Sequence, residues 1–426
     1  MLLKSWQTIA GLIGIGLIAR EFSPEVQGFY YTFASLIGLQ SFVELGLHLV
    51  ISNFASHEWS RLRLNREGRI EGSPEPISRL VSLGRFVFRW YAIASLAFLF
   101  LAGVGGYWFL GRASNHGVDW QMPWFFHIVF SSILLWCMPF LALLEGCDQV
   151  AQVARFRTAQ AVAGTLAIWV AILAGTELWA APAYSLISGI CCLYYLLVSK
   201  RFFFKPFFEP PKDGRVSWRG EILPMQWRLA LQGVTGYFVL SLFTPVMFYY
   251  HGPAVAGQMG MTWQIVGAIQ AVATIWVLTK APKFGMLIAA REYSVLDAKW
   301  RTAALVSMVL MLSGVFVVFI SIYYLRHNEW SPINRLLSPL PFLLLAGGAV
   351  LTQGVQCIAI YLRAHKREAL MPVGLTTGVL MGISVWQLGM DYGAPGAAAA
   401  YFLVMSTVSF PMAVFIWRRC RLEWHC

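Results

Sequence analysis

Long apolar stretches separated by short polar segments dominate the chain. A transmembrane helix needs about 17–25 predominantly apolar residues to cross roughly 30 Å of hydrocarbon. Twelve stretches of about that length occur, at residues 3–19, 26–51, 84–110, 123–147, 158–175, 180–199, 229–250, 254–280, 302–325, 339–362, 370–390 and 396–417. The first has no cleavage-type site before Arg20, so we interpret it as a retained helix. The pattern predicts an all-α, polytopic membrane protein with about twelve transmembrane helices.

The positions of lysine and arginine predict the orientation of these helices. If the N-terminus is cytoplasmic, the alternating segments place 28 of the 32 basic residues on the cytoplasmic side. Basic residues concentrate in the cytoplasmic loops of membrane proteins. The split therefore predicts a multi-pass protein of the cytoplasmic (inner) membrane with both termini in the cytoplasm.

Composition excludes several classes of protein. Only 12% of the residues are charged, whereas soluble proteins have about 25%. The net charge of +12 lies in short loops, which indicates topology signals and membrane lipids as partners rather than nucleic acid. The seven cysteines show no spacing typical of zinc ligands, and the chain contains no P-loop. We therefore predict no disulfide, metal, cofactor or catalytic residue, and a protein that is not an enzyme.

The chain divides into two halves that resemble each other. Six predicted spans lie in residues 1–199 and six in 229–426, and a basic segment with a Pro-Pro pair, 200–228, connects them in the cytoplasm. The pattern Pro-x-Val-x-Gly begins the second span at residues 24–28 and the eighth at 253–257. An even number of helices separates the two copies, so they share one orientation. This predicts two parallel six-helix lobes around a central cavity.

One segment connects this plan with a known family. Residues 19–30 read Ala-Arg-Glu-Phe-Ser-Pro-Glu-Val-Gln-Gly-Phe-Tyr. This resembles the first outer corner of the polysaccharide-export branch of the multidrug/oligosaccharidyl-lipid/polysaccharide (MOP) exporter superfamily. The resemblance implies a flippase for a polyprenyl-linked glycan of the O-antigen type, with glycan polymerase and assembly machinery as partners. Members carry cationic residues in the cavity, whereas no arginine or lysine lies in the middle of a span here.

Glu44 is the carboxylate that the pattern places deep in a span, and His48 follows four residues later. Residues at this spacing lie on one face of a continuous helix. A charge at the membrane centre costs roughly 2.5–3.5 kcal/mol, and such residues commonly mark ion or substrate pathways. Two interpretations follow: a protonation site that couples an ion gradient to transport, or a hydrogen bond that fixes helix packing.

The candidate substrate-binding residues are cations near span ends and amides inside spans. Arginine binds phosphate in a bidentate manner, and amides hydrogen-bond to sugar hydroxyls. Snorkelling at the membrane interface explains the cations equally well, and hydrogen bonds between helices explain the amides. The candidates are Arg20, Gln40, Arg85, Arg89, Gln232, Gln264, Gln270 and Lys280.

Three functions are compatible with these features. The leading one is a flippase for a lipid-linked oligosaccharide, or an exporter of a polysaccharide precursor, that works by alternating access. A cation-coupled multidrug exporter of the same superfamily would be expected to carry several intramembrane acids, and Glu44 is the one that we place there. A membrane-embedded glycan polymerase or glycosyltransferase would need large loops, but the predicted outer loops are short.

Overall fold

The computed structural model of the chain describes residues 2–112, 117–211, 214, 216–328 and 331–424. Eight helical stretches of this part are long and apolar enough to cross a membrane, or ten if each of two bent pairs is one span. The 20-residue helix α1 (Leu2–Glu21) and a break at Gly393 within Met371–Trp424 account for the remaining predicted stretches. The prediction of an all-α polytopic membrane protein is confirmed, and a short hairpin is added to it.

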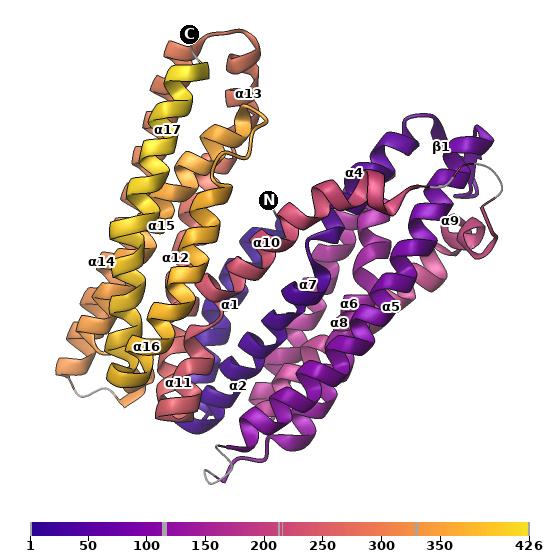
Figure 1. Cartoon of the computed structure of the whole chain (residues 1–426). Helices are drawn as coiled ribbons and strands as arrows, with labels where there is room; N and C mark the ends of the chain where they lie inside the picture. Colours follow the sequence, from indigo (N-terminus) through magenta and orange to yellow (C-terminus); the bar gives the residue numbers. More distant parts are fainter. Residues whose placement is uncertain (1, 113–116, 212–213, 215, 329–330, 425–426) are drawn as a thin grey trace. The chain divides into compact units, whose positions relative to one another are not determined.

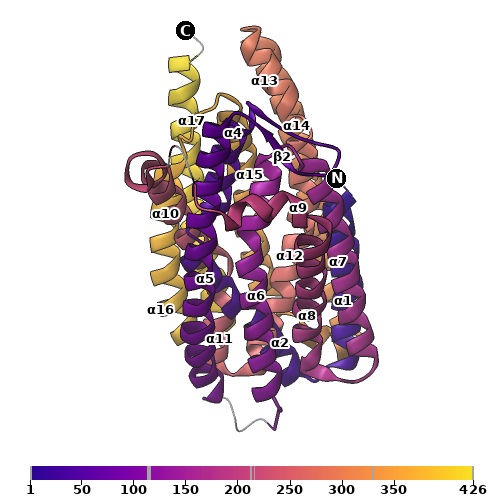
Figure 2. The same cartoon turned by 90° about the vertical axis from the view of Figure 1, so that its right-hand side faces the viewer.

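The first compact unit comprises Met1–Ala10 and Leu36–Val234. Helix α5 packs against α6, α6 against α8 and α4, and α7 against α8 (Figures 1 and 2). Strands β1 and β2 form an antiparallel hairpin that pairs Leu62 with Gly72. The elements of this part are η1 (Gly38–Gln40), α3 (Ser41–Glu44), α4 (Leu47–Trp59), β1 (Leu62–Leu64), β2 (Ile70–Gly72), α5 (Pro74–Gly111), α6 (Gln121–Gly146), α7 (Val150–Leu173), η3 (Glu177–Trp179), α8 (Ala180–Tyr194), η4 (Tyr195–Ser199), α9 (Arg201–Phe204), η5 (Lys205–Phe208) and η6 (Trp218–Ile222).

The second compact unit comprises Gly11–Ser35 and Thr235–Cys426. Helix α15 contacts α12, α14, α16 and α17, and Figure 1 shows these helices in orange to yellow. Helices α2 and α10 each contribute residues to both units. The elements are α2 (Pro24–Ile37), α10 (Leu223–Leu240), α11 (Phe243–His251), α12 (Pro253–Leu278), α13 (Ala281–Ala289), α14 (Tyr293–His327), η7 (Ser331–Arg335), α15 (Pro339–Ala364), α16 (Met371–Val404), η8 (Met405–Ser409) and α17 (Phe410–Trp424).

Proline and glycine explain where these helices begin and how closely they approach. Pro74, Pro253 and Pro339 stand in the first turn of their helices, where the missing N–H leaves no hydrogen bond unmade. Gly106 of α5 lies under the ring of Trp124 of α6, and a Cβ there would be 2.3 Å from the indole. Small residues of this kind allow close helix packing in membranes, where the hydrophobic effect does not drive association between helices.

Much of the segment between the predicted lobes packs onto the first unit. Phe203, Phe204 and Phe207 are buried, and the last two have ring contacts with Phe88 of α5. We predicted two lobes, residues 1–199 and 229–426, from the order of the spans along the chain. These lobe boundaries stay a prediction. Phe204, Phe207 and Phe208 of this segment therefore contact α5 within the first unit.

An ion-pair cluster fixes the same region. Arg79 of α5 donates to Glu58 of α4 at 2.8 Å and to Glu221 of η6 at 2.7 Å. Glu221 also accepts the Ser217 N–H at 2.9 Å. This backbone hydrogen bond, followed by the Arg79 guanidinium, holds the pKa of the Glu221 carboxyl below its usual value. Three separate segments are therefore joined through one arginine.

In the second unit, a buried polar network crosses three helices. Gln353 of α15 is fully buried, accepts from Thr274 of α12 at 2.8 Å and donates to Ser307 of α14 at 2.7 Å. Ser307 in turn donates to the Ala273 carbonyl at 2.8 Å. Near the end of the same helices, Asp297 accepts from Tyr361 at 2.7 Å and pairs with Arg421. These polar bonds hold the helices of this unit in register.

Candidate functional site

A break in the second predicted span organises the candidate site. We predicted a continuous helix over residues 26–51, and this is wrong in detail: the two helical parts meet at an angle of 46°. Leu45 (φ 51°) and Gly46 (φ 67°) both adopt the left-handed conformation, which is costly for leucine. Gly46 is also confined, because a Cβ there would lie 2.7 Å from the Cβ of Leu229 on α10.

Glu44 and His48 stand on either side of this break. The Glu44 Oε1 and His48 Nδ1 atoms are 2.9 Å apart, and the two side chains are 14% and 38% exposed. The Nδ1 atom has no aligned hydrogen-bond partner among the described residues, so the contact is electrostatic. The residues meet as predicted, but across two left-handed residues rather than on the face of one helix. Their role in coupling stays a prediction.

Tyr91 of α5 completes this group, and sequence reasoning missed it. Its side chain is fully buried, it interacts electrostatically with Glu44, and its hydroxyl has no hydrogen-bond partner within the described part of the chain. The signal was available: Gly84, Tyr91 and Phe98 recur every seven residues on the buried side of α5. A carboxyl, an imidazole and a phenol at a helix break can exchange or share a proton.

Four predicted substrate-binding residues also belong to the first unit. Gln40 and Gln232 are half-buried, and their segments are neighbours, because a Cβ on Gly233 would lie 3.7 Å from the Ser41 carbonyl oxygen. Arg85 donates to the Phe208 carbonyl at 3.2 Å, and Arg89 is exposed one turn further along α5. Gln40 is thus four residues before Glu44, next to the helix break. The binding roles of all four stay predictions.

The other four candidates belong to the second unit and do not form one cluster. Arg20 pairs with Glu21 at 3.1 Å and is 83% exposed. Lys280 is exposed, with its Nζ 5.4 Å from the ring of Trp276. Pro24, four residues after Arg20, approaches Gly257 near the start of α12, whereas Lys280 follows the last turn, so roughly 35 Å of helix lies between at 1.5 Å per residue. A single ligand head group does not span that distance.

Gln264 and Gln270 lie between these ends, on α12. Both side chains are half-buried. The Oε1 atom of Gln264 is buried and accepts no hydrogen bond from the described residues. An amide oxygen in this state can accept from a water or a ligand hydroxyl. Gln264 therefore has an unused hydrogen-bond acceptor that a ligand of the second unit can bind.

The two copies of the Pro-x-Val-x-Gly pattern contact each other. A Cβ on Gly28 would lie 1.9 Å from the Pro253 carbonyl oxygen, and one on Gly257 would lie 3.2 Å from the Pro24 carbonyl oxygen. Gln27, which sequence reasoning missed, is 1% exposed and donates to the Gly257 carbonyl at 2.8 Å. The repeat is therefore a site of reciprocal backbone packing between the starts of α2 and α12.

Comparisons with known proteins place the fold. No family model and no curated protein matches the sequence. Among solved structures, an inward-facing multidrug resistance MATE family transporter of the MOP superfamily aligns with a TM-score of 0.61 and 12% identity, covering 97% of this chain and 96% of its own. The lipid II flippase MurJ, in an inward closed conformation, aligns with a TM-score of 0.66 and 12% identity, covering 100% and 91%.

A third structure, that of the MATE multidrug transporter DinF-BH, aligns with a TM-score of 0.57 and 12% identity, covering 100% of this chain and 94% of its own. Similarity at this identity establishes the fold. The chain therefore has the multi-pass helical fold of the MOP superfamily transporters, the superfamily that residues 19–30 indicated.

Proposed function

We propose that this protein is a transporter that flips a lipid-linked oligosaccharide, carried on a polyprenyl diphosphate, across the cytoplasmic membrane by alternating access. The helix break at Leu45 and Gly46 beside Glu44 carries the proposal. Non-helical backbone at membrane depth is tolerated where it is buried in protein or lines a water-filled path. An ionisable residue in the same place typically marks a substrate or ion pathway.

Uncharged amides favour a glycan as the transported group. Gln264 has a buried oxygen without a donor among the described residues, and Gln40, Gln232 and Gln270 are half-buried. Sugar hydroxyls can supply the donor that the Gln264 oxygen lacks, whereas an aromatic cationic drug supplies few. MurJ, which shares this fold, is a lipid II flippase, and this supports a lipid-linked cargo here.

The titratable group of the first unit supports a coupling step. The Glu44 carboxyl is 2.9 Å from His48 and interacts electrostatically with the buried Tyr91. Protonation of Glu44 changes its electrostatic interactions with His48 and Tyr91 and in this way alters how readily the two halves of the broken helix separate. We assign the moving lobes to residues 1–199 and 229–426, with both termini cytoplasmic and a glycan polymerase or assembly complex receiving the product.

Disruption of the gene followed by analysis of lipid carriers tests this function. We expect lipid-linked oligosaccharide to accumulate in the inner leaflet. Purified protein in vesicles should then move a fluorescent polyprenyl-diphosphate oligosaccharide between leaflets. A normal carrier-lipid pool with truncated polymer would overturn the proposal in favour of a polymerase.

A cation-coupled multidrug exporter is the second candidate. Two observations favour it: the carboxylate–imidazole contact between Glu44 and His48, and the fold shared with MATE multidrug transporters. Drug sensitivity after gene disruption, with a normal pool of carrier lipid, would support this function over the flippase. An increase in carrier-linked glycan without drug sensitivity would exclude it.

A further inference from the structure

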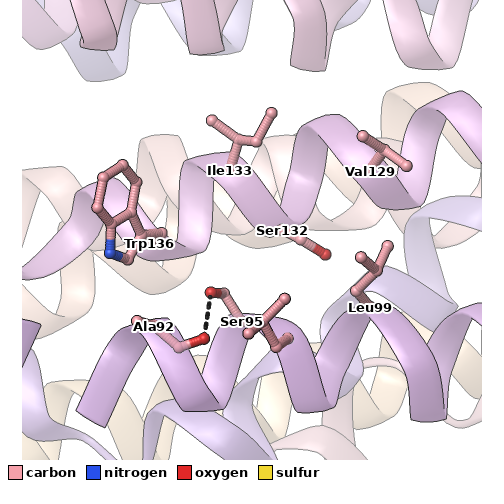
Figure 3. A pocket seen from close by; sticks show the side chains of 8 residues that line it. Ala92, Ser95, Leu99, Val129, Ser132, Ile133 and Trp136 are labelled. Atoms are coloured by element: carbon pink, nitrogen blue, oxygen red, sulfur yellow. Dashed lines mark hydrogen bonds between the residues drawn. The ribbon is translucent and has the colours of Figure 1, made fainter. Parts of the chain in front are cut away.

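An apolar groove lies between α5 and α6 of the first unit. It has a volume of about 280 Å³. Its walls come from Ala92, Leu96 and Leu99 on α5 and from Val129, Ile133 and Trp136 on α6 (Figure 3). Ala92 and Leu99 are seven residues apart, so the groove follows α5 for roughly 10 Å at 1.5 Å per residue.

The groove offers almost no hydrogen-bonding group. Two serines line it, but Ser95 donates to the Ala92 carbonyl at 3.0 Å and Ser132 donates to the Ile128 carbonyl at 2.8 Å. Figure 3 shows the first of these bonds within the groove. Leu96 is 55% exposed and Trp136 is 38% exposed, although both lie in helices long and apolar enough to span a membrane. The occupant is therefore a hydrocarbon chain and not a sugar.

Two arginines extend this face of α5 beyond the groove. Residues 85, 89, 92, 96 and 99 follow the 4-3-4-3 spacing that places side chains along one face of a helix. Arg89 is one turn from Ala92 and is exposed. Arg85, one turn further, donates one N–H to the Phe208 carbonyl, and a guanidinium has five. Phe208 is 84% exposed, as expected of an aromatic residue at a membrane interface.

We propose that this groove and the two arginines form a binding site for an anionic glycerophospholipid. The phosphate binds Arg85 and Arg89, because guanidinium groups bind phosphate in a bidentate manner. One acyl chain lies between α5 and α6. The groove faces outward and has no polar group for a glycan, so the occupant is a resident lipid of the bilayer and not the transported cargo. This proposal assigns a resident lipid to Arg85 and Arg89 in place of the substrate head group that the sequence predicted for them.

A second groove provides a comparison within the same chain. It lies on α14 and α15, has a volume of about 550 Å³, and is lined by apolar residues such as Val309, Phe316 and Leu343. No lysine or arginine lies within one turn of its lining residues on either helix. This second groove should accept acyl chains without regard to the charge of the head group.

The test is photo-crosslinking of the full-length protein in vesicles. The probes are phosphatidylglycerol and zwitterionic phosphatidylcholine, each with a diazirine in one acyl chain, and labelled peptides are mapped by mass spectrometry. We expect phosphatidylglycerol to label residues 92–99 and 129–136 at least about tenfold more than phosphatidylcholine, as for two charge-assisted contacts. Both probes should label the α14 groove equally, and this labelling also reports that the protein is folded.

Two variants separate the head-group contact from the groove. Arg85→Gln with Arg89→Gln should reduce phosphatidylglycerol labelling to the phosphatidylcholine level, whereas Arg291→Gln with Arg301→Gln, a matched exposed pair, should not. Ala92→Phe fills the groove and should abolish labelling there by both probes. Equal labelling by both lipids in the wild type, or selectivity that survives loss of the two arginines, would overturn the site. Displacement of the label by equimolar polyprenyl diphosphate would also overturn it, in favour of the carrier lipid.

Discussion

Replacing Gly28 with alanine perturbs the closest backbone approach in the repeat. The added Cβ would lie 1.9 Å from the Pro253 carbonyl oxygen and 2.4 Å from its carbon, whereas ordinary contacts begin at about 3.4 Å. The difference of about 1.5 Å has to come from movement of α2 against α12. Both neighbouring groups are backbone, so no side-chain rotation relieves the clash.

The energetic cost follows from this geometry. Overpacking of a tight core costs typically 1–3 kcal/mol, occasionally more, and a backbone clash of this depth belongs at the upper end. A cost of about 3 kcal/mol lowers the population of the packed arrangement roughly 150-fold. The clash is absent from conformations in which the starts of α2 and α12 are separated, so the variant favours those conformations. If transport alternates between the packed and the separated conformations, as we propose, it should be slower in the variant.

Hydrogen exchange measured by mass spectrometry provides the assay. Amides in the first two turns of α2 and α12 should lose protection by up to about 150-fold in Gly28→Ala. Gly257→Ala, whose Cβ would meet its nearest neighbour at 3.0 Å, should have a smaller effect. Gly267→Ala on the same helix has nothing within 4 Å and is the control. Unchanged exchange in Gly28→Ala, or an equal loss in Gly267→Ala, would refute the reasoning.

Three further predictions address the other polar groups. Glu44→Gln should abolish the pH dependence of transport, and Tyr91→Phe should shift it, because the phenol interacts electrostatically with the carboxyl; flipping measured across a pH series checks both. The usual pKa of a glutamate carboxyl is about 4.3, and the pKa of Glu221 lies lower. The ion pair with Arg79 therefore stabilises the folded protein above the usual pKa, and this stabilisation is lost as the pH falls through the lowered pKa. Thermal unfolding of Glu221→Gln should show a small, acid-insensitive deficit of under about 1 kcal/mol. Gln353→Ala should lower the stability by roughly 1–3 kcal/mol, and with it the unfolding temperature, since it removes the acceptor of the Thr274 hydroxyl and a donor to the buried Ser307 hydroxyl.

Control variants give these predictions a reference. Glu209→Gln removes an exposed carboxylate from the same segment as Glu221 and should leave acid sensitivity unchanged. Gln270→Ala replaces a half-buried amide of the second unit and should cost less stability than Gln353→Ala. Wild-type pH dependence in Glu44→Gln would remove the coupling role. A Glu221→Gln protein that loses stability with acid as the wild type does would contradict the assigned contribution.

The apolar stretches predicted most of the fold because membrane crossing imposes length and hydropathy on the sequence itself. Each of the twelve stretches falls largely on helical residues within the described part of the chain. Hydropathy does not report backbone conformation, so the left-handed pair Leu45–Gly46 was missed inside an otherwise apolar run. The glycine alone was insufficient as a signal, because Gly16 and Gly267 lie in helices that continue through them.

Long-range pairing was also invisible to local reasoning. Asp297 and Arg421 are 124 residues apart, and only packing of α14 against the end of α17 makes them partners. For Tyr91, helical periodicity could have indicated a buried face of α5, but it could not have identified Glu44 as the interacting acid. The repeat behaved differently: the pattern at residues 24–28 and 253–257 was visible as sequence, and its reciprocal contact is the structural reason for its glycines.

At the position that the repeat relates to Glu44, the second half of the chain has no titratable side chain. At the offset of 229 residues that relates the two copies, Ala273 stands in the place of Glu44. Ala273 is buried, and its carbonyl accepts from Ser307 within the network of Gln353. Position 273 therefore has a neutral side chain and a hydrogen-bonded carbonyl, whereas Glu44 has a carboxyl that is poorly aligned with His48 and lies beside a helix break. If a proton binds at Glu44, as we propose, it acts on the first half of the chain and has no counterpart at position 273, so the proposed coupling is asymmetric.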